Sequence, residues 1–142
     1  MQNTERRISL FHLTGLKIKH GDSVEVEGRV KSDTARFAIE LGVDAANVAI
    51  HFNPRFSDSG SKIVLNNLIN SHWQTQQIEE NPLVKEEDFT VLITFNADNF
   101  EIVVCNKTTL QFPNHSEKDM LEEFWINGDI QVKRVTINSL IN

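Results

Sequence analysis

Cysteine is nearly missing from this sequence, and long apolar runs are missing altogether. Cys105 is the single cysteine, which excludes an intramolecular disulfide and a zinc centre built on several thiolates. The first residues contain no apolar segment of signal-peptide length, and no window approaches the ~20 apolar residues that a membrane-spanning helix needs. These absences predict a protein that folds in the reducing cytoplasm. Export that requires no signal peptide is left open.

Positive charge is also in short supply. The chain has 14 Lys and Arg residues against 20 Asp and Glu residues, which gives a formal net charge of −6. Such a chain is a poor match for the phosphate backbone of nucleic acids or for an anionic lipid surface. The histidines show no pair at metal-ligand spacing, and no nucleophile elbow, phosphate loop or H-E-x-x-H motif occurs. We therefore expect no nucleic-acid partner, no metal, no cofactor and no enzyme activity.

The sequence does contain a series of short segments rich in β-branched and aromatic residues. Its length predicts one domain, residues 1–142. Because these segments recur at close spacing with almost no helical pattern, we expect an all-β fold, an antiparallel sandwich or barrel. The expected strands are Val24–Glu27, Phe37–Leu41, Ala49–Phe52, Lys62–Asn66, Phe89–Phe95, Phe100–Cys105, Thr109–Phe112, Phe124–Ile126 and Ile130–Ile137.

Three connections carry local signals. Four residues, Asn96–Asn99, of which three are polar, separate two expected strands and predict a hairpin, and the dipeptide Asn127-Gly128 predicts a second one. The segment Ser116–Glu123 predicts a helical turn, with Ser116 as its N-cap.

One strand combines polar residues that suit a ligand. In an extended chain, alternate residues share a face, so His51, Asn53 and Arg55 point one way while Ile50 and Phe52 point to the core. Pro54 donates no ladder hydrogen bond, which predicts that the strand ends there or lies near a sheet edge. The imidazole, carboxamide and guanidinium together offer donors and acceptors that match sugar hydroxyls. The alternative is a polar strand face that only meets water.

The segment His51-Phe52-Asn53-Pro54-Arg55 resembles the H-x-N-P-R signature of the galectin family, and the similarity continues downstream. Ile63–Asn66 resembles the V-x-N strand of that family, Trp73 follows after a short loop, and Phe112–Asn114 is similar to its F-P-N segment. The resemblance spans residues 13–137. It implies a jelly-roll sandwich of two antiparallel sheets, like that of legume lectins, which binds β-galactosides on one concave face.

The resemblance also implies a role for each matched residue. His51, Asn53 and Arg55 would bind the axial 4-hydroxyl of galactose and neighbouring oxygens, and Asn66 would contact the 6-hydroxyl. Trp73 would stack on the apolar face of the ring, where a flat indole gains much dispersion contact. Implied partners are β-galactoside glycans such as lactose and N-acetyllactosamine on glycoproteins or glycolipids.

The resemblance is broken after the tryptophan, where the family pattern is W-x-x-E-x-R. Gln76 replaces the glutamate and Ile78 replaces the arginine. Gln76 can still accept a hydrogen bond but carries no charge, and Ile78 can make none. We therefore expect a galactoside-binding lectin with weakened or altered affinity. The alternative is a galectin-fold protein that no longer binds lactose usefully and acts through protein contacts.

The two ends of the chain alternate in a way that suits edge strands. These segments are Ile8–Leu13 and Val132–Ile141. The resemblance implies that such terminal strands pair two copies into a homodimer, which exposed sheet edges make physically plausible.

Overall fold

The computed structural model of the chain describes residues 9–140, and these residues form strands, turns and loops without a helix. The described residues therefore contain no helix that is long and apolar enough to cross a membrane. The strands are β1 (Phe11–Leu13), β2 (Ile18–Lys19), β3 (Ser23–Val30), β4 (Phe37–Asp44), β5 (Asn47–Arg55), β6 (Lys62–Ile69), β7 (His72–Trp73), β8 (Gln77–Glu80), β9 (Asp88–Phe95), β10 (Asn99–Val104), β11 (Thr108–Pro113), β12 (Met120–Leu121), β13 (Glu123–Gly128) and β14 (Ile130–Asn138).

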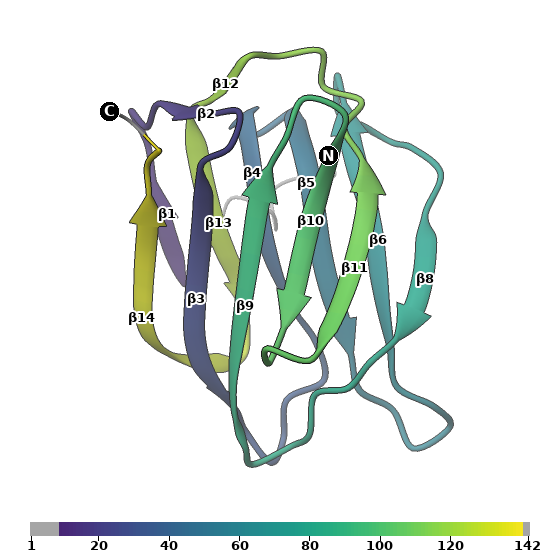
Figure 1. Cartoon of the computed structure of the whole chain (residues 1–142). Helices are drawn as coiled ribbons and strands as arrows, with labels where there is room; N and C mark the ends of the chain where they lie inside the picture. Colours follow the sequence, from purple (N-terminus) through teal and green to yellow (C-terminus); the bar gives the residue numbers. More distant parts are fainter. Residues whose placement is uncertain (1–8, 141–142) are drawn as a thin grey trace.

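Two antiparallel sheets face each other, as Figure 1 shows. One sheet has seven strands in the order β1-β13-β4-β5-β6-β7, with β8 also paired to β6, and the other has five in the order β11-β10-β9-β3-β14. Strands β2 and β12 form a small pair of their own. This is the jelly-roll sandwich that the family resemblance implies, and the expected antiparallel all-β fold is confirmed.

Alternation along the strands builds the core between the sheets. In β3, every second residue from Val24 to Val30 is buried, and the residues that alternate with them are half-buried. From the seven-stranded sheet, Phe37 and Phe52 meet Phe95 and Phe100 of the five-stranded sheet in one cluster of buried side chains. Most of the large apolar side chains thus lie between the layers, while Val48, Leu68 and Trp125 form a separate small cluster. The outer face of the seven-stranded sheet therefore has room for polar residues.

Two of the three predicted connections are wrong. Asn96–Asn99 does join the antiparallel strands β9 and β10. Asn127-Gly128, in contrast, ends β13, which pairs with β4, and the chain then enters the other sheet as β14, paired with β3. Gly128 suits this sheet-to-sheet crossing because its φ is +110° and a Cβ there would lie 2.5 Å from the Phe37 Cα. The segment 116–123 forms a loop, the short strand β12 and the start of β13 instead of a helical turn.

Strand β5 lies between β4 and β6, near the centre of its sheet. Pro54 predicts that the strand ends there or lies near a sheet edge, and the first alternative holds, because β5 ends at Arg55, one residue after Pro54. The terminal strands do lie at edges: β1 is the outermost strand of one sheet and β14 of the other. Ile8 and Ile141, the outer ends of the predicted terminal segments, lie outside the described residues.

Candidate functional site

Strand pairing arranges the polar residues of the seven-stranded sheet in rows across its outer face. Paired residues of an antiparallel ladder point to the same side. The first row is Trp125, Glu40, His51 and Asn66; the second contains Asn53, Val64 and Ile78; the third is Arg36, Arg55, Lys62 and Glu80. The predicted division of β5 is confirmed, because Ile50 and Phe52 are fully buried in the core on the opposite side.

The imidazole of His51 is held by a buried carboxylate on the neighbouring strand. His51 Nδ1 lies 2.5 Å from Glu40 Oε2, and the Asn127 amide donates to the other carboxylate oxygen of Glu40 at 3.0 Å. The Glu40 side chain is only 1% exposed. A carboxylate accepts hydrogen bonds, so neutral His51 donates from Nδ1 and keeps Nε2 as an acceptor. Glu40 therefore fixes which kind of partner His51 can bind.

Asn53 and Arg55 form the next unit of the site. Asn53 is 3% exposed; its amide donates to the Phe37 carbonyl at 2.7 Å, and its carbonyl oxygen accepts from Arg55 Nε at 2.9 Å. This arrangement orients the guanidinium of Arg55 and leaves its two terminal nitrogens without a partner among the described residues. Burial, and then the nearby charge of Arg36, lower the pKa of Arg55 below its usual value. Arg55 is thus a cation with no carboxylate partner in the described part of the chain.

Trp73 and Asn66 form the opposite wall. The indole of Trp73 is 43% exposed, and its ring centroid lies 4.7 Å from that of His51 at an interplanar angle of 55°. The Asn66 amide donates to the Gln74 carbonyl at 3.2 Å, and its own carbonyl oxygen accepts from the Asn67 N–H. These contacts place an exposed aromatic plate beside a row of oriented polar groups.

All six residues predicted to bind a ligand line one cleft of about 640 Å³: His51, Asn53, Arg55, Asn66, Trp73 and Gln76. Its size falls within the range of small-molecule sites. No group of three or more His, Cys, Asp or Glu residues within 9–140 is placed to hold a metal ion. An aromatic plate facing hydrogen-bonding groups of both kinds is an arrangement that suits a sugar ring, with one apolar face and a rim of hydroxyls.

Comparison with known proteins agrees with this geometry. The sequence profile of the galactoside-binding lectin domain matches residues 11–137. The chain belongs to this family. A β-galactoside-binding lectin of Electrophorus electricus is 35% identical to this galactoside-binding lectin over 103 residues, which cover 70% of this chain and 80% of that protein. Mouse galectin-1 is 31% identical over 125 residues, 86% of this chain and 93% of its own.

Solved galectin structures share the fold of this family member. The crystal structure of chicken galectin 2 has a TM-score of 0.86 at 28% identity and covers 92% of this chain and all of its own. CG-16, described as a homodimeric agglutinin from chicken liver, has a TM-score of 0.84 at 25% identity, over 90% of this chain and 98% of its own.

The half of the lectin cleft nearest β8 differs from the family pattern. Gln76 lines the cleft with an exposed side chain that has no hydrogen-bond partner among the described residues, and Ile78 is 51% exposed. The carboxylate of Glu79 on β8 faces away from the cleft and accepts a hydrogen bond from Gln77. Glu80 does lie on the outer face, in the third row opposite Lys62.

Sequence reasoning missed several residues of the cleft, and two of them, Glu40 and Asn127, hold the predicted side chains in place. Alternation in the expected strand Phe37–Leu41 does place Glu40 opposite the core-facing residues, which is a signal that could have found it. Asn127 carried the signal of a turn dipeptide, and only the pairing of β13 with β4 brings it to Glu40.

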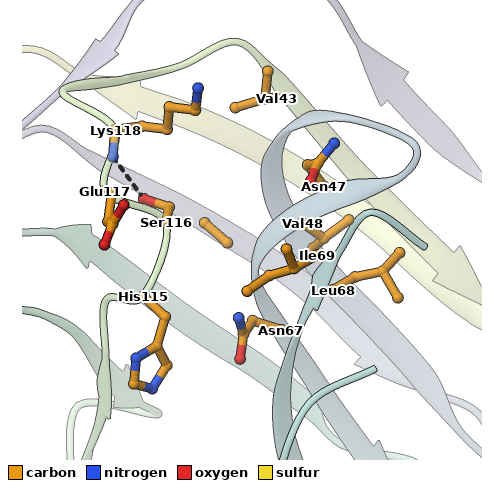
Figure 2. Close-up of a pocket in the computed structure, with 11 residues that line it drawn as sticks. Val43, Asn47, Val48, Asn67, Leu68, Ile69, His115, Ser116, Glu117 and Lys118 are labelled. Atoms are coloured by element: carbon orange, nitrogen blue, oxygen red, sulfur yellow. Dashed lines mark hydrogen bonds between the residues drawn. The ribbon is translucent and has the colours of Figure 1, made fainter. Parts of the chain in front are cut away.

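A second, smaller hollow of about 250 Å³ lies elsewhere, between the ends of β5 and β6 and the loop before β12. Figure 2 shows the Asn67 side chain pointing toward this loop, with His115 nearby. Asn67 is 2% exposed, and its carbonyl oxygen has no hydrogen-bond partner among the described residues. The hollow lies below the usual size of small-molecule sites, about 300–1,000 Å³, and it contains none of the six predicted residues.

Proposed function

We propose that this protein is a non-enzymatic lectin that binds terminal β-galactosides in the cleft formed by β4, β5, β6 and β7. The observation that carries the proposal is the pairing of oriented polar groups with an exposed indole. His51 offers an acceptor and Arg55 offers donors, while Trp73 offers an apolar plate beside them. A galactose ring can contact all three side chains at once. Its axial 4-hydroxyl would point toward His51 and Arg55, and its C–H face would lie on Trp73.

Selectivity for galactose over glucose follows from the same geometry. Glucose has an equatorial 4-hydroxyl, which would point away from the groups that Asn53 and Glu40 hold in place. The donors of Arg55 and the acceptor of His51 would then be desolvated without a partner, and such losses discriminate strongly between ligands. Lactose and N-acetyllactosamine, on glycoproteins or glycolipids, are the glycans that we expect to bind.

The test is calorimetric titration with lactose, and with glucose as the control sugar. We expect heat with lactose and none with glucose. Arg55→Ala should weaken lactose binding by about tenfold to a hundredfold, since a hydrogen bond from a charged group contributes about 1.5–3 kcal/mol. Trp73→Ala should also weaken it without a large fall in Tm, because the indole is 43% exposed. If either variant binds lactose as well as the parent, this cleft is not the site.

A second candidate function is favoured by the β8 side of the cleft, which has Gln76 and Ile78 in place of a charged pair. In this alternative the protein keeps the fold but acts through contacts with other proteins. Each lost interaction of this kind contributes about 1–3 kcal/mol when desolvated, so lactose affinity could fall below a useful range. A folded protein that gives no heat with lactose or galactose, and binds nothing on a glycan array, would favour this alternative.

A homodimer through the terminal strands is part of the proposal. Strand β14 is an edge strand, and its Ile137 is 39% exposed although its pairing partner Val24, which points to the same side, is 1% exposed. The core is therefore left open along this edge, next to unpaired backbone groups. A second copy related by a two-fold axis would cover the exposed core and pair with the free backbone groups of β14.

A further inference from the structure

We infer that the cleft continues toward β8 over an apolar surface, formed by Val64 and Ile78 and called the apolar step below. The protein then selects β-galactosides in which the group attached to galactose is apolar. This inference rests on the proposed function, since it concerns the group attached to a galactose already bound in the cleft. It differs from that proposal in assigning ligand selection to Ile78 on β8.

Pairing across the sheet places the step beside the polar groups of the cleft. Asn53 pairs with Val64, and Val64 pairs with Ile78, so the three side chains lie in one row on three adjacent strands. Val64 is 3% exposed and lines the cleft. Ile78 lies immediately beyond it, on a strand at the edge of the sheet.

The direction of Ile78 is fixed by its neighbours on β8. The Gln77 side-chain amide donates to the Gln111 carbonyl of the other sheet at 2.9 Å and to Glu79 Oε2 at 2.8 Å. Gln77 and Glu79 therefore point to the inside of the sandwich. Alternation then directs Ile78 outward, toward the side of the cleft, which agrees with its 51% exposure.

The chemistry of this side differs from that of the opposite side. A group linked to galactose that extends toward β13 meets Asn127 and Arg36, which are polar. A group that extends toward β8 meets Val64 and Ile78, with uncharged Gln76 next to them. Sugar hydroxyls placed over Ile78 would lose their hydrogen bonds to water and gain none from the protein. An alkyl or aryl group would instead remove exposed apolar surface from water. The β8 side thus favours apolar linked groups over hydroxylated ones.

Titration followed by protein NMR tests the inference, because it measures weak affinities and reports on individual methyl groups. The probes are methyl β-galactoside and phenyl β-galactoside. We expect the phenyl compound to bind about threefold to tenfold more tightly, as the burial of a few tens of Å² of apolar surface predicts. The methyl signals of Ile78 should shift with the phenyl compound and change little with the methyl compound.

Variants at position 78 separate selection from a general loss of binding. Ile78→Ser should weaken the binding of phenyl β-galactoside until its affinity is close to that of methyl β-galactoside. Ile78→Leu should keep the preference for the phenyl compound. Val84→Ser is the matched control, because Val84 is 52% exposed but lies outside β8 and the cleft; it should preserve the preference.

The outcomes distinguish this inference from the proposed function. If neither galactoside binds the parent protein, the proposed function fails and the inference falls with it. If both bind with equal affinity, or if Ile78→Ser keeps the preference for the phenyl compound, the cleft binds galactosides but Ile78 does not select among them, and the inference alone is overturned.

Discussion

At the scale of single residues, His51 depends on a carboxylate of the neighbouring strand for its orientation. Glu40 is almost completely buried, receives hydrogen bonds from His51 and Asn127, and lines the floor of the cleft. Glu40 therefore acts on the ligand only by orienting His51, so it is a positioning residue. A residue of this kind can be changed without removing any of the groups predicted to touch the sugar.

Replacing Glu40 by glutamine tests this dependence. Glu40→Gln keeps the size of the side chain but removes the charge that favours Nδ1 as the donor of His51. Because charge-assisted hydrogen bonds are roughly twice as strong as neutral ones, we expect lactose affinity to fall by about threefold to thirtyfold. Calorimetry with lactose and a thermal melt provide the measurement. Glu25→Gln, on β3 of the other sheet, should leave the affinity unchanged; equal binding by Glu40→Gln and the parent would refute the positioning role.

The residue scale also shows what the sequence could predict about the site. The face of β5 follows from alternation alone, and six cleft residues were predicted by that alternation together with the family resemblance. The pairing partner of a strand does not follow from alternation, because partners lie far apart in the chain. Asn127, which is 87 residues from Glu40 in the chain, therefore became part of the site only when β13 was placed beside β4.

At the scale of strands, a cluster of charged side chains links three neighbouring strands of the five-stranded sheet, β14, β3 and β9. Lys133 of β14 donates to both carboxylate oxygens of Asp88 at 2.9 Å, and Arg29 of β3 donates to one of them at 3.2 Å. These bonds, that from Lys133 first, hold the pKa of Asp88 at the start of β9 below its usual value. The cluster is exposed to solvent, so its contribution to the free energy of unfolding is small and depends on salt.

The pH dependence of this cluster has a definite sign. Since the pKa of Asp88 is lower in the folded state, the stabilisation is present above the unfolded-state pKa and is lost as the pH falls through the folded-state pKa. We expect Asp88→Asn to lower the Tm slightly at neutral pH and to match the parent in strong acid. Thermal melts across pH measure this. Asp98→Asn, in the β9–β10 turn, is the control. A deficit of Asp88→Asn that persists unchanged in acid would contradict the ion-pair explanation.

The connections between strands show why part of the fold could not be predicted from the sequence. The β9–β10 hairpin was predicted because both of its strands lie close in sequence and pair with each other. Asn127-Gly128 has the same local chemistry, yet it joins two sheets, because β13 is already paired on both sides, with β1 and β4, and β14 pairs with β3 of the other sheet. The segment 116–123 has an N-cap residue but no apolar stripe that would bind a helix to the core. Local turn signals therefore predict where the chain turns, not which sheet it joins.

At the scale of the whole molecule, the open core along β14 is the feature on which the proposed homodimer rests. Val135 and Ile137 point to the same side as buried Val26 and Val24 but remain partly exposed at the edge of the sandwich. We expect the protein to form dimers, as measured by light scattering after size exclusion over a range of concentrations. Ile137→Lys should shift the protein toward the monomer, because a charge at the covered edge would be desolvated without a partner.

The dimer prediction separates assembly from sugar binding. Ile137 lies on the five-stranded sheet and not in the cleft, so Ile137→Lys should bind lactose with the affinity of the parent. It should nevertheless lose the ability to cross-link galactose-coated beads, since cross-linking needs two sites on one particle. A parent protein that stays monomeric at every concentration tested would exclude the terminal-strand dimer.

Strand β8 has a consequence for how such a protein can diverge. Its outward residue Ile78 pairs with Val64 at the margin of the sheet and is 51% exposed, and neither Gln76 nor Ile78 belongs to the core cluster between the sheets. Substitutions at positions 76 and 78 are therefore almost free of the stability constraint that purges most changes in a buried strand. Gene copies of this chain can acquire new glycan preferences one surface residue at a time, while the folding of every copy stays the same.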